Sequence, residues 1–305
     1  MKLFYGNDGV RIMGYEYLAE KTLRALDPEL HSRYRNCVVV SDRMLSRYQS
    51  TFPEYTDHTT LHTLKILDIC NALIGDQIDR LTAGDLYVLL MGALFHDVGM
   101  GISEKDFYAF YREAFSDETC SFSKEELREL IRENHHELSG WFLKKYWRVF
   151  DIPNESYAKA IVQVCRGHRK TDLYDRREFP EAFSVTENCS VVLPYLAALI
   201  RLADELDIAA DRNSEFLYDP AFIKNDGSRL EFLKHQSIQT VEILPAGVLI
   251  KAVSDDPGIC QAVVEAVSKL AEVLHDCRKV VSVRTSFTIQ QQRIILDLNS
   301  SLMLL

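Results

Sequence analysis

Six histidine and aspartate side chains stand where they could bind metal ions. Each lies at the end of an expected helix or on its apolar stripe. They are His62, His96, Asp97, His135, His168 and Asp204. Buried carboxylates are costly unless they are paired or bound to a metal, and histidine with carboxylate suits Mn, Fe, Co, Ni or Zn. Six ligands exceed one tetrahedral site, so we expect one or two divalent ions, with Mg kept as a further candidate.

The spacing of apolar residues predicts that these ionisable side chains point into the protein core. His62 is followed by Ile66, Ile69 and Leu73, which together form one face of a helix. Equivalent spacing puts three more ionisable residues on apolar helix faces: His135, His168 and Asp204. His96 and Asp97 end a further apolar run, GALFHDVGMG at 92–101. The pattern therefore predicts several helices that converge on one polar centre.

The elements that position these residues are expected to be helices throughout residues 15–210. The pattern predicts individual helices at 57–74, 84–96, 123–147, 155–168 and 189–210. Asp57 is the expected N-cap of the first of them. Ser123 with Glu126 three residues later is typical of a capping box.

After about residue 213 the pattern becomes rich in strands. Strand-like stretches are 235–244, 247–253, 281–289 and 292–298, and an amphipathic helix is expected over 257–277. Residues 245–247 predict a hairpin turn. We therefore expect a mainly α protein, with a helical domain over 1–212 and a small α+β domain over 213–305. That second domain is expected to form a dimer contact or a lid over the metal cleft.

Bulk composition narrows the classes of partner. The chain has 305 residues, 47% of them hydrophobic, with a net charge of -10, so binding to extended nucleic acid is not expected. The most apolar stretch, 191–203, is too short to span a bilayer and contains Arg201. The N-terminus has no signal-peptide pattern, and the seven cysteines include no CxxC pair. We therefore expect a cytoplasmic protein with reduced thiols and no membrane partner.

Several motifs resemble the HD-domain metal-dependent phosphohydrolase superfamily over roughly 55–212. LFHDVG (94–99) is similar to its HD signature, and LIRLADELDIAADR (199–212) to its final motif. HHELSGWFL (135–143) has a small residue four after His135, as in the branches that bind two metals. The resemblance implies an HD-type helical bundle over the first domain.

The resemblance also implies roles for the six candidate ligands. A first metal would be bound by His62, His96, Asp97 and Asp204. A second metal would be bound by Asp97, which bridges, together with His135 and His168. The two ions would activate water for attack on phosphorus. The implied substrate is a small phosphate ester, expected to be a nucleotide.

Four residues are candidates for a direct part in catalysis: Asp97, His58, Lys65 and His136. His58 lies one turn before His62, either as a donor or general acid or as a helix residue without a chemical role. Lys65 stands where the superfamily often has a basic residue. His136 would exchange roles with His135 after a shift of one residue, but periodicity favours His135 as the ligand. His136 would then face substrate or solvent.

Four cations are candidates for substrate binding: Arg166, Arg169, Lys170 and Arg212. The first three flank His168, where they would either meet phosphate groups or form a solvated basic edge. Asp207 would orient a ligand or pair with Arg212.

Two alternative functions fit the same ligand set. One is a di-iron oxygenase with the HD fold, and the other is a nucleotide-binding sensor or effector without turnover. The segment HRKTDL (168–173) lacks the pattern of cyclic-di-GMP phosphodiesterases, which makes that substrate less favoured. We also expect a homo-oligomer formed through the C-terminal domain.

Overall fold

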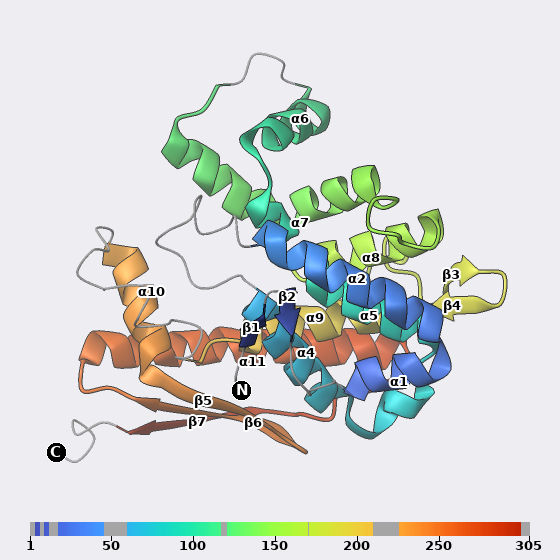
Figure 1. Cartoon of the computed structure of the whole chain (residues 1–305). Helices are drawn as coiled ribbons and strands as arrows, with labels where there is room; N and C mark the ends of the chain where they lie inside the picture. The colour runs from blue at the N-terminus through green and yellow to red at the C-terminus, as the bar shows by residue number, and fades with distance from the viewer. Residues whose placement is uncertain are drawn as a thin grey trace.

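The computed structural model describes residues 4–6, 9–11, 18–45, 60–116, 121–169, 171–209 and 226–299. It is mainly helical with small sheets, as predicted (Figure 1). The α-helices before residue 210 are α1 (Leu18–Leu26), α2 (Pro28–Leu45), α4 (Thr60–Ile74), α5 (Ala83–Phe95), α6 (Glu104–Phe115), α7 (Lys124–Tyr146), α8 (Glu155–Gly167) and α9 (Leu193–Leu206). Two short 3-10 helices follow α4 and α5: η1 (Gly75–Arg80) and η2 (Val98–Gly101).

Helix α5 is the central helix of the core. Its residues from Gly84 to Phe95 are all buried, which is why the sequence is apolar on every face. The helix begins at a capping box between Thr82 and Asp85. It ends at Phe95, so His96 and Asp97 follow directly, inside the protein.

Among the described residues, no single helix is long and apolar enough to cross a membrane. One bent pair, Ala83–Gly101 with Glu104–Phe115 at 99°, passes that test jointly on length and composition. The first member contains α5, and burial in the core already accounts for its apolar composition.

Most predicted helices before residue 210 are confirmed. Helix α7 begins after the predicted Ser123–Glu126 capping box. Helix α9 starts later than expected, because β4 (Cys189–Val191) pairs antiparallel with β3 (Phe183–Thr186), a hairpin that the sequence analysis missed. Pro194 lies in the first turn of α9, a position that suits a residue without an amide proton. Asp57, the expected N-cap, lies outside the described residues.

The C-terminal part combines two helices with a three-stranded sheet. Its elements are α10 (Asp226–Ser237), β5 (Ile238–Leu244), β6 (Gly247–Val253), α11 (Pro257–Arg284) and β7 (Ile294–Asn299). Strand β6 is central, antiparallel to β5 and parallel to β7. The predicted hairpin turn lies between β5 and β6. At the N-terminus, β1 (Phe4–Gly6) pairs antiparallel with β2 (Gly9–Arg11).

The strand predicted over 281–289 is wrong, because α11 continues to Arg284. Val281 is fully buried there. The Arg284 guanidinium donates to the carbonyls of Leu173 and Phe179 and pairs with Glu181. These tertiary contacts outweigh the β-propensity of the valines in this stretch.

Side-chain contacts join the C-terminal part to the helical part. Helix α11 runs alongside α9 (Figure 1), and the rings of Tyr195 and Phe287 stack at 4.3 Å. Gln77 exchanges hydrogen bonds with the backbone of Thr288. The expected domain boundary at 212 and 213 falls outside the described residues and stays a prediction, as does the homo-oligomer.

Candidate metal centre

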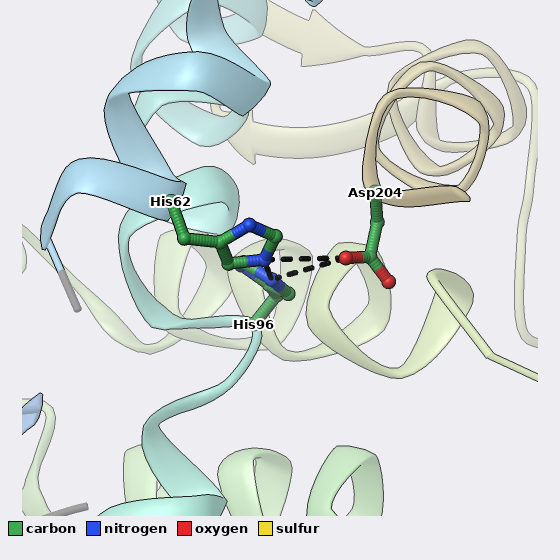
Figure 2. Close-up of side chains that lie close together, drawn as sticks. All are labelled: His62, His96 and Asp204. Carbon is green, nitrogen blue, oxygen red and sulfur yellow. Dashed lines mark hydrogen bonds and ion pairs between the residues drawn. The ribbon is translucent and has the colours of Figure 1, made fainter. Parts of the chain in front are cut away.

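The first of two His/Asp groups joins three helices or helix ends. His62 comes from α4, His96 from the end of α5 and Asp204 from α9 (Figure 2). His62 Nε2 lies 3.2 Å from His96 Nε2 and 3.2 Å from Asp204 Oδ1, and the His96–Asp204 pair is 3.9 Å apart. Both histidines are buried. This group could bind a metal ion.

The second group lies directly beside the first. His135 from α7 and His168 from the end of α8 bring their Nε2 atoms within 2.9 Å of each other. Asp97 Oδ1 is 3.3 Å from His135 Nε2 and 3.6 Å from His168 Nε2. All three residues are buried, and this group could also bind an ion.

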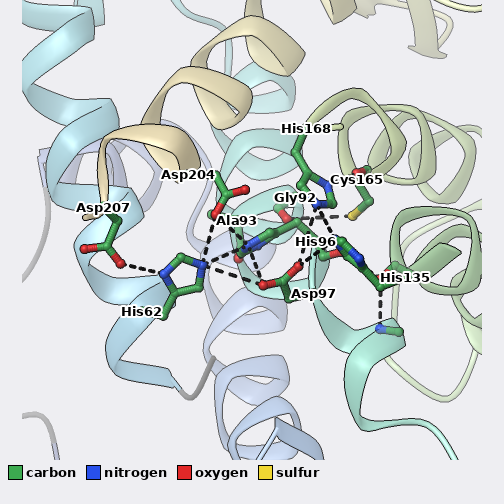
Figure 3. A network of polar contacts seen from close by, with 12 residues as sticks. His62, Gly92, Ala93, His96, Asp97, His135, Cys165, His168, Asp204 and Asp207 are labelled. Atoms are coloured by element: carbon green, nitrogen blue, oxygen red, sulfur yellow. Dashed lines mark hydrogen bonds and ion pairs between the residues drawn. The ribbon is translucent and has the colours of Figure 1, made fainter. Parts of the chain in front are cut away.

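Asp97 faces both groups, one oxygen to each (Figure 3). Its Oδ2 lies 3.3 Å from His96 Nε2 and 3.7 Å from His62 Nε2. Its Oδ1 faces the second pair of histidines. The carboxylate therefore lies between the groups, where it could bridge two ions.

Hydrogen bonds at Nδ1 orient all four histidine rings. Three rings donate to the backbone carbonyl three residues earlier: His96 to Ala93, His135 to Arg132 and His168 to Cys165. His62 donates instead to Asp207 Oδ2 at 2.6 Å, so Asp207 orients this candidate ligand, whereas its alternative partner Arg212 lies outside the described residues. Because these acceptors carry no proton to give, each neutral ring keeps its proton on Nδ1 and leaves a lone pair on Nε2.

When all four rings are neutral, as metal ligands must be, the Nε2 lone pairs point at one another within each group. Such an arrangement is repulsive unless a cation lies between the nitrogens. A transition-metal ion about 2.0–2.2 Å from each ligand would place the ligand atoms roughly 3 Å or slightly more apart, as the His62–His96 and His135–His168 pairs are. The donor set thus fits divalent ions such as Mn, Fe, Co, Ni or Zn.

The electrostatic balance differs between the groups. Burial lowers the pKa of His96, but the carboxylates of Asp97 and Asp204 outweigh it and raise that pKa to about 9. Burial lowers the pKa of His135. Burial also lowers the pKa of His168, and the neighbouring His96 and His135 lower it further, well below its usual value. For Asp204, the polar contact with His62 and the charge of protonated His96 outweigh burial, so its pKa is lowered in the absence of metal.

Ser139 and Gly99 hold the second group against the end of α5. Ser139 is fully buried on α7, where its hydroxyl donates to the His96 carbonyl at 2.7 Å and accepts from the Gly99 amide at 2.8 Å. A Cβ on Gly99 would lie 2.2 Å from the His135 carbonyl oxygen. Glycine is therefore required for η2 to approach α7 this closely.

Arg201 fixes the end of α8 relative to α9. Its guanidinium donates to the carbonyls of Gly167 at 2.8 Å and Thr171 at 2.7 Å. These carbonyls lie on both sides of His168, and Arg201 is one turn from Asp204 on the same helix. The contact positions one residue of each group.

A cleft of about 330 Å³ opens next to both groups. Asp97, His135 and Asp204 form part of its lining, and Arg169 lies beside them. The opposite wall comes from the C-terminal part, with residues of α10 and α11 that include Leu230, Lys234, His235, Glu265, Lys269 and Leu270. The C-terminal part therefore shapes access to the candidate metal centre.

The other predicted site residues differ in how close they lie to the two His/Asp groups and the cleft. Arg169 lines the cleft, whereas Arg166 pairs with Glu137 and Glu178. Lys65 Nζ is 4.0 Å from Asp207 Oδ1, and Asp207 in turn accepts the hydrogen bond of His62.

His136 lies outside both groups, with Nε2 3.8 Å from Glu137 Oε1. Burial and the neighbouring His135 lower its pKa to about 4. Three predicted residues lie outside the described part of the chain: His58, Lys170 and Arg212. Their roles stay predictions.

Several positioning residues were not predicted from the sequence. The only available signals were a small residue four after His135 and an arginine in an otherwise apolar run, which are Ser139 and Arg201. No local signal indicates that Lys234 and Lys269 face the cleft, because their position depends on how the C-terminal part packs.

A family model described as HD-CE matches residues 52–278. Since the match covers more than half of the chain, this protein belongs to the HD-CE family of the HD superfamily, whose members are typically metal-dependent hydrolases. The match continues through α10 and most of α11. A comparison with curated proteins found no match.

Proposed function

We propose that this protein is a metal-dependent phosphohydrolase or phosphodiesterase that acts on a nucleotide or a related small phosphate ester. The observation that carries the proposal is the position of Asp97, with one carboxylate oxygen turned to each His/Asp group. A shared carboxylate is what a centre with two adjacent ions requires, and such centres suit displacement at phosphorus.

Bound divalent ions would supply Lewis-acid activation of water and of a phosphoryl oxygen. His62, His96 and Asp204 would hold one ion, His135 and His168 the other, with Asp97 between them. The Nδ1 hydrogen bonds fix each imidazole in the tautomer that binds metal. Asp207 also adds negative charge behind His62, which makes that ring a stronger ligand.

With metal bound, the cleft beside the centre would suit a small anionic substrate, because the ions would offset the five carboxylates that line it together with three cationic residues. Arg169 contributes a guanidinium, and no ion pair occupies it within the described part of the chain. Helices α10 and α11 form the opposite wall, which supports the lid role expected for the C-terminal part. Apolar Leu230 and Leu270 next to Lys234 and Lys269 would accommodate the non-reacting part of a nucleotide.

The test combines metal analysis with a substrate screen. Protein purified without added metal is analysed for bound ions, stripped with a chelator and reloaded separately with Mn, Fe, Co, Ni, Zn or Mg. Each form is then assayed on nucleotides and cyclic dinucleotides. We expect hydrolysis that depends on metal and is lost in Asp97→Asn. His275→Ala, a change to an exposed histidine on α11, is the matched control and should retain activity.

The same experiment separates the alternative functions. Oxygen uptake with Fe(II) and substrate, without phosphate-ester hydrolysis, would favour the di-iron oxygenase. Nucleotide binding without turnover in any metal would favour the sensor or effector. Either result would contradict the hydrolase proposal.

A further inference from the structure

A second pocket shares Arg169 with the main cleft. It has a volume of about 340 Å³ and is lined by Arg132, Glu133, His136 and Arg169. The two cavities therefore share the side chain of Arg169, the residue directly after His168.

The lining of this pocket favours an anion. It contains two guanidinium groups, one imidazole and a single carboxylate, in a chain whose net charge is -10. Arg132 pairs with Glu129, but both side chains are about half exposed, at 48% and 49%. Glu129 accepts three hydrogen bonds from the Arg132 guanidinium, and a phosphate group could take its place because it offers the same forked arrangement of oxygens. Planar guanidinium groups match the oxygens of phosphate well.

His136 adds unused hydrogen-bonding capacity. Its side chain is only 15% exposed, and its Nδ1 is buried without a hydrogen-bond partner among the described residues. Buried polar atoms are normally hydrogen-bonded. The imidazole of this pocket is therefore not fully satisfied by the protein around it.

The backbone fixes this pocket relative to the second His/Asp group. The Arg132 carbonyl accepts the Nδ1 hydrogen bond of His135 at 2.6 Å, and His136 follows His135. Arg169 follows His168. Three of the four lining residues are therefore tied to the two histidines of the second group, so the pocket keeps a set position beside the centre.

We propose that the pocket of Arg132, Glu133, His136 and Arg169 binds a second phosphate group of the substrate. Resting on the proposed hydrolase function, this makes the substrate a phosphoanhydride such as a nucleoside diphosphate or triphosphate, not a simple monoester. The reacting phosphoryl group lies at the two His/Asp groups. This phosphoryl group carries the nucleoside, which extends along the main cleft, and the adjoining phosphate lies between the two arginines. Water forms the new P–O bond, the anhydride P–O bond breaks, and the adjoining phosphate leaves.

The test measures binding of inorganic pyrophosphate and inorganic phosphate by calorimetry. The full-length protein is used as purified, after dialysis against buffer without added metal. We expect pyrophosphate to bind at least about tenfold more tightly than phosphate. Arg132→Gln and Arg169→Gln should each reduce that ratio by about tenfold, since each removes a charge-assisted contact with the second phosphate.

Arg128→Gln is the matched control, because Arg128 lies one turn earlier on α7 and does not line the pocket. It should leave the ratio unchanged, and circular dichroism verifies that all three variants fold. The proposal is overturned if wild type shows no preference for pyrophosphate. It is also overturned if Arg128→Gln loses as much as the other two.

A parallel assay compares kcat/KM for a nucleoside monophosphate and diphosphate. Equal turnover of both, unaffected by the arginine variants, would overturn the second-phosphate pocket while the hydrolase function stands. A preference for pyrophosphate that depends on both arginines, without hydrolysis of any phosphate ester, would overturn the hydrolase function while the pocket stands.

Discussion

The two His/Asp groups share Asp97 but differ in their charge. The first, with His62 and His96, has its own carboxylate in Asp204 and a further one behind His62 in Asp207. The second, with His135 and His168, has Asp97 as its only carboxylate, and both of its rings donate to backbone carbonyls instead of a second-layer aspartate. The opposite pKa shifts of His96, which is raised, and His135, which is lowered, report the same difference.

If the proposed function holds, this difference predicts that the two groups bind their ions with unequal affinity. Carboxylates attract a dication more strongly than imidazoles or carbonyl dipoles do, so the first group should hold its ion more tightly. The second ion would bind more weakly and exchange more readily. The changes below test the inequality, from the largest expected effect to the smallest.

Asp97→Ala should have the largest effect, because it removes the carboxylate that both groups share. We expect bound metal to fall close to zero and activity to fall by more than about 100-fold, because even residues that only orient ligands cost 10–100-fold. The helical fold should remain. Elemental analysis and circular dichroism measure these effects, and normal metal content in this variant would contradict a shared centre.

His168→Ala should empty only the second group. We expect one ion to be retained and kcat to fall more than KM rises, because the lost ion acts on the reacting group. His62→Ala is the counterpart for the first group and should cost more metal. Metal titration of both variants decides the order. Equal losses would show that the groups do not differ in affinity.

Asp207→Asn should weaken the first group without removing any direct ligand. The change replaces the charged acceptor of the His62 Nδ1 hydrogen bond with a neutral amide. We expect the metal affinity of the first group to fall by about 10–100-fold. Competition with a chelator of known affinity measures it. Asp79→Asn, at an exposed position in η1, is the control. An unchanged affinity would mean that Asp207 only fills space.

Ser139→Ala should loosen the second group from the end of α5. The change leaves the Gly99 amide and the His96 carbonyl without their hydrogen-bond partner, which lowers the free energy of unfolding by about 1–3 kcal/mol. Urea denaturation measures the loss. Ser268→Ala, exposed on α11, should have almost no effect. A stability equal to wild type would remove the positioning role of Ser139.

The pH dependence of metal binding should also differ between the groups. His96 has a pKa of about 9 without metal, so below that pH an ion must displace its proton, and affinity should rise by up to about tenfold per pH unit toward pH 9. The pKa values of His135 and His168 are lowered, so the second group should bind with little dependence at neutral pH. Calorimetry in buffers of different ionisation enthalpy counts the released protons, and none released would contradict this.

The six grouped residues could be predicted from the sequence because they mark five helices or helix ends, with His96 and Asp97 together at the end of α5. His62 or His135 on an apolar stripe is a local signal that helical periodicity detects. The contacts that hold the groups together are not local. Ser139 reaches Gly99 across 40 residues, and no pattern within either segment indicates that pairing.

The C-terminal part was harder to predict for the same reason. The stretch after Val280 is rich in valine and locally favours a strand, yet burial and the Arg284 contacts keep it helical. The wall that α10 and α11 form beside the centre also depends on tertiary packing. Nothing in the local sequence distinguishes Lys234 and Lys269 of this wall from ordinary surface lysines.

The His62–Asp207 hydrogen bond joins positions 145 residues apart. An ion held by His62, His96 and Asp204 consequently acts as a cross-link that closes a very long loop, and loop closure is an entropic cost that grows with loop length. The centre cannot form before α4, α5 and α9 have met. At a free metal concentration one hundred times the dissociation constant, binding would add about 2.7 kcal/mol to the free energy of unfolding. The free metal concentration would thereby set part of the stability of the folded chain.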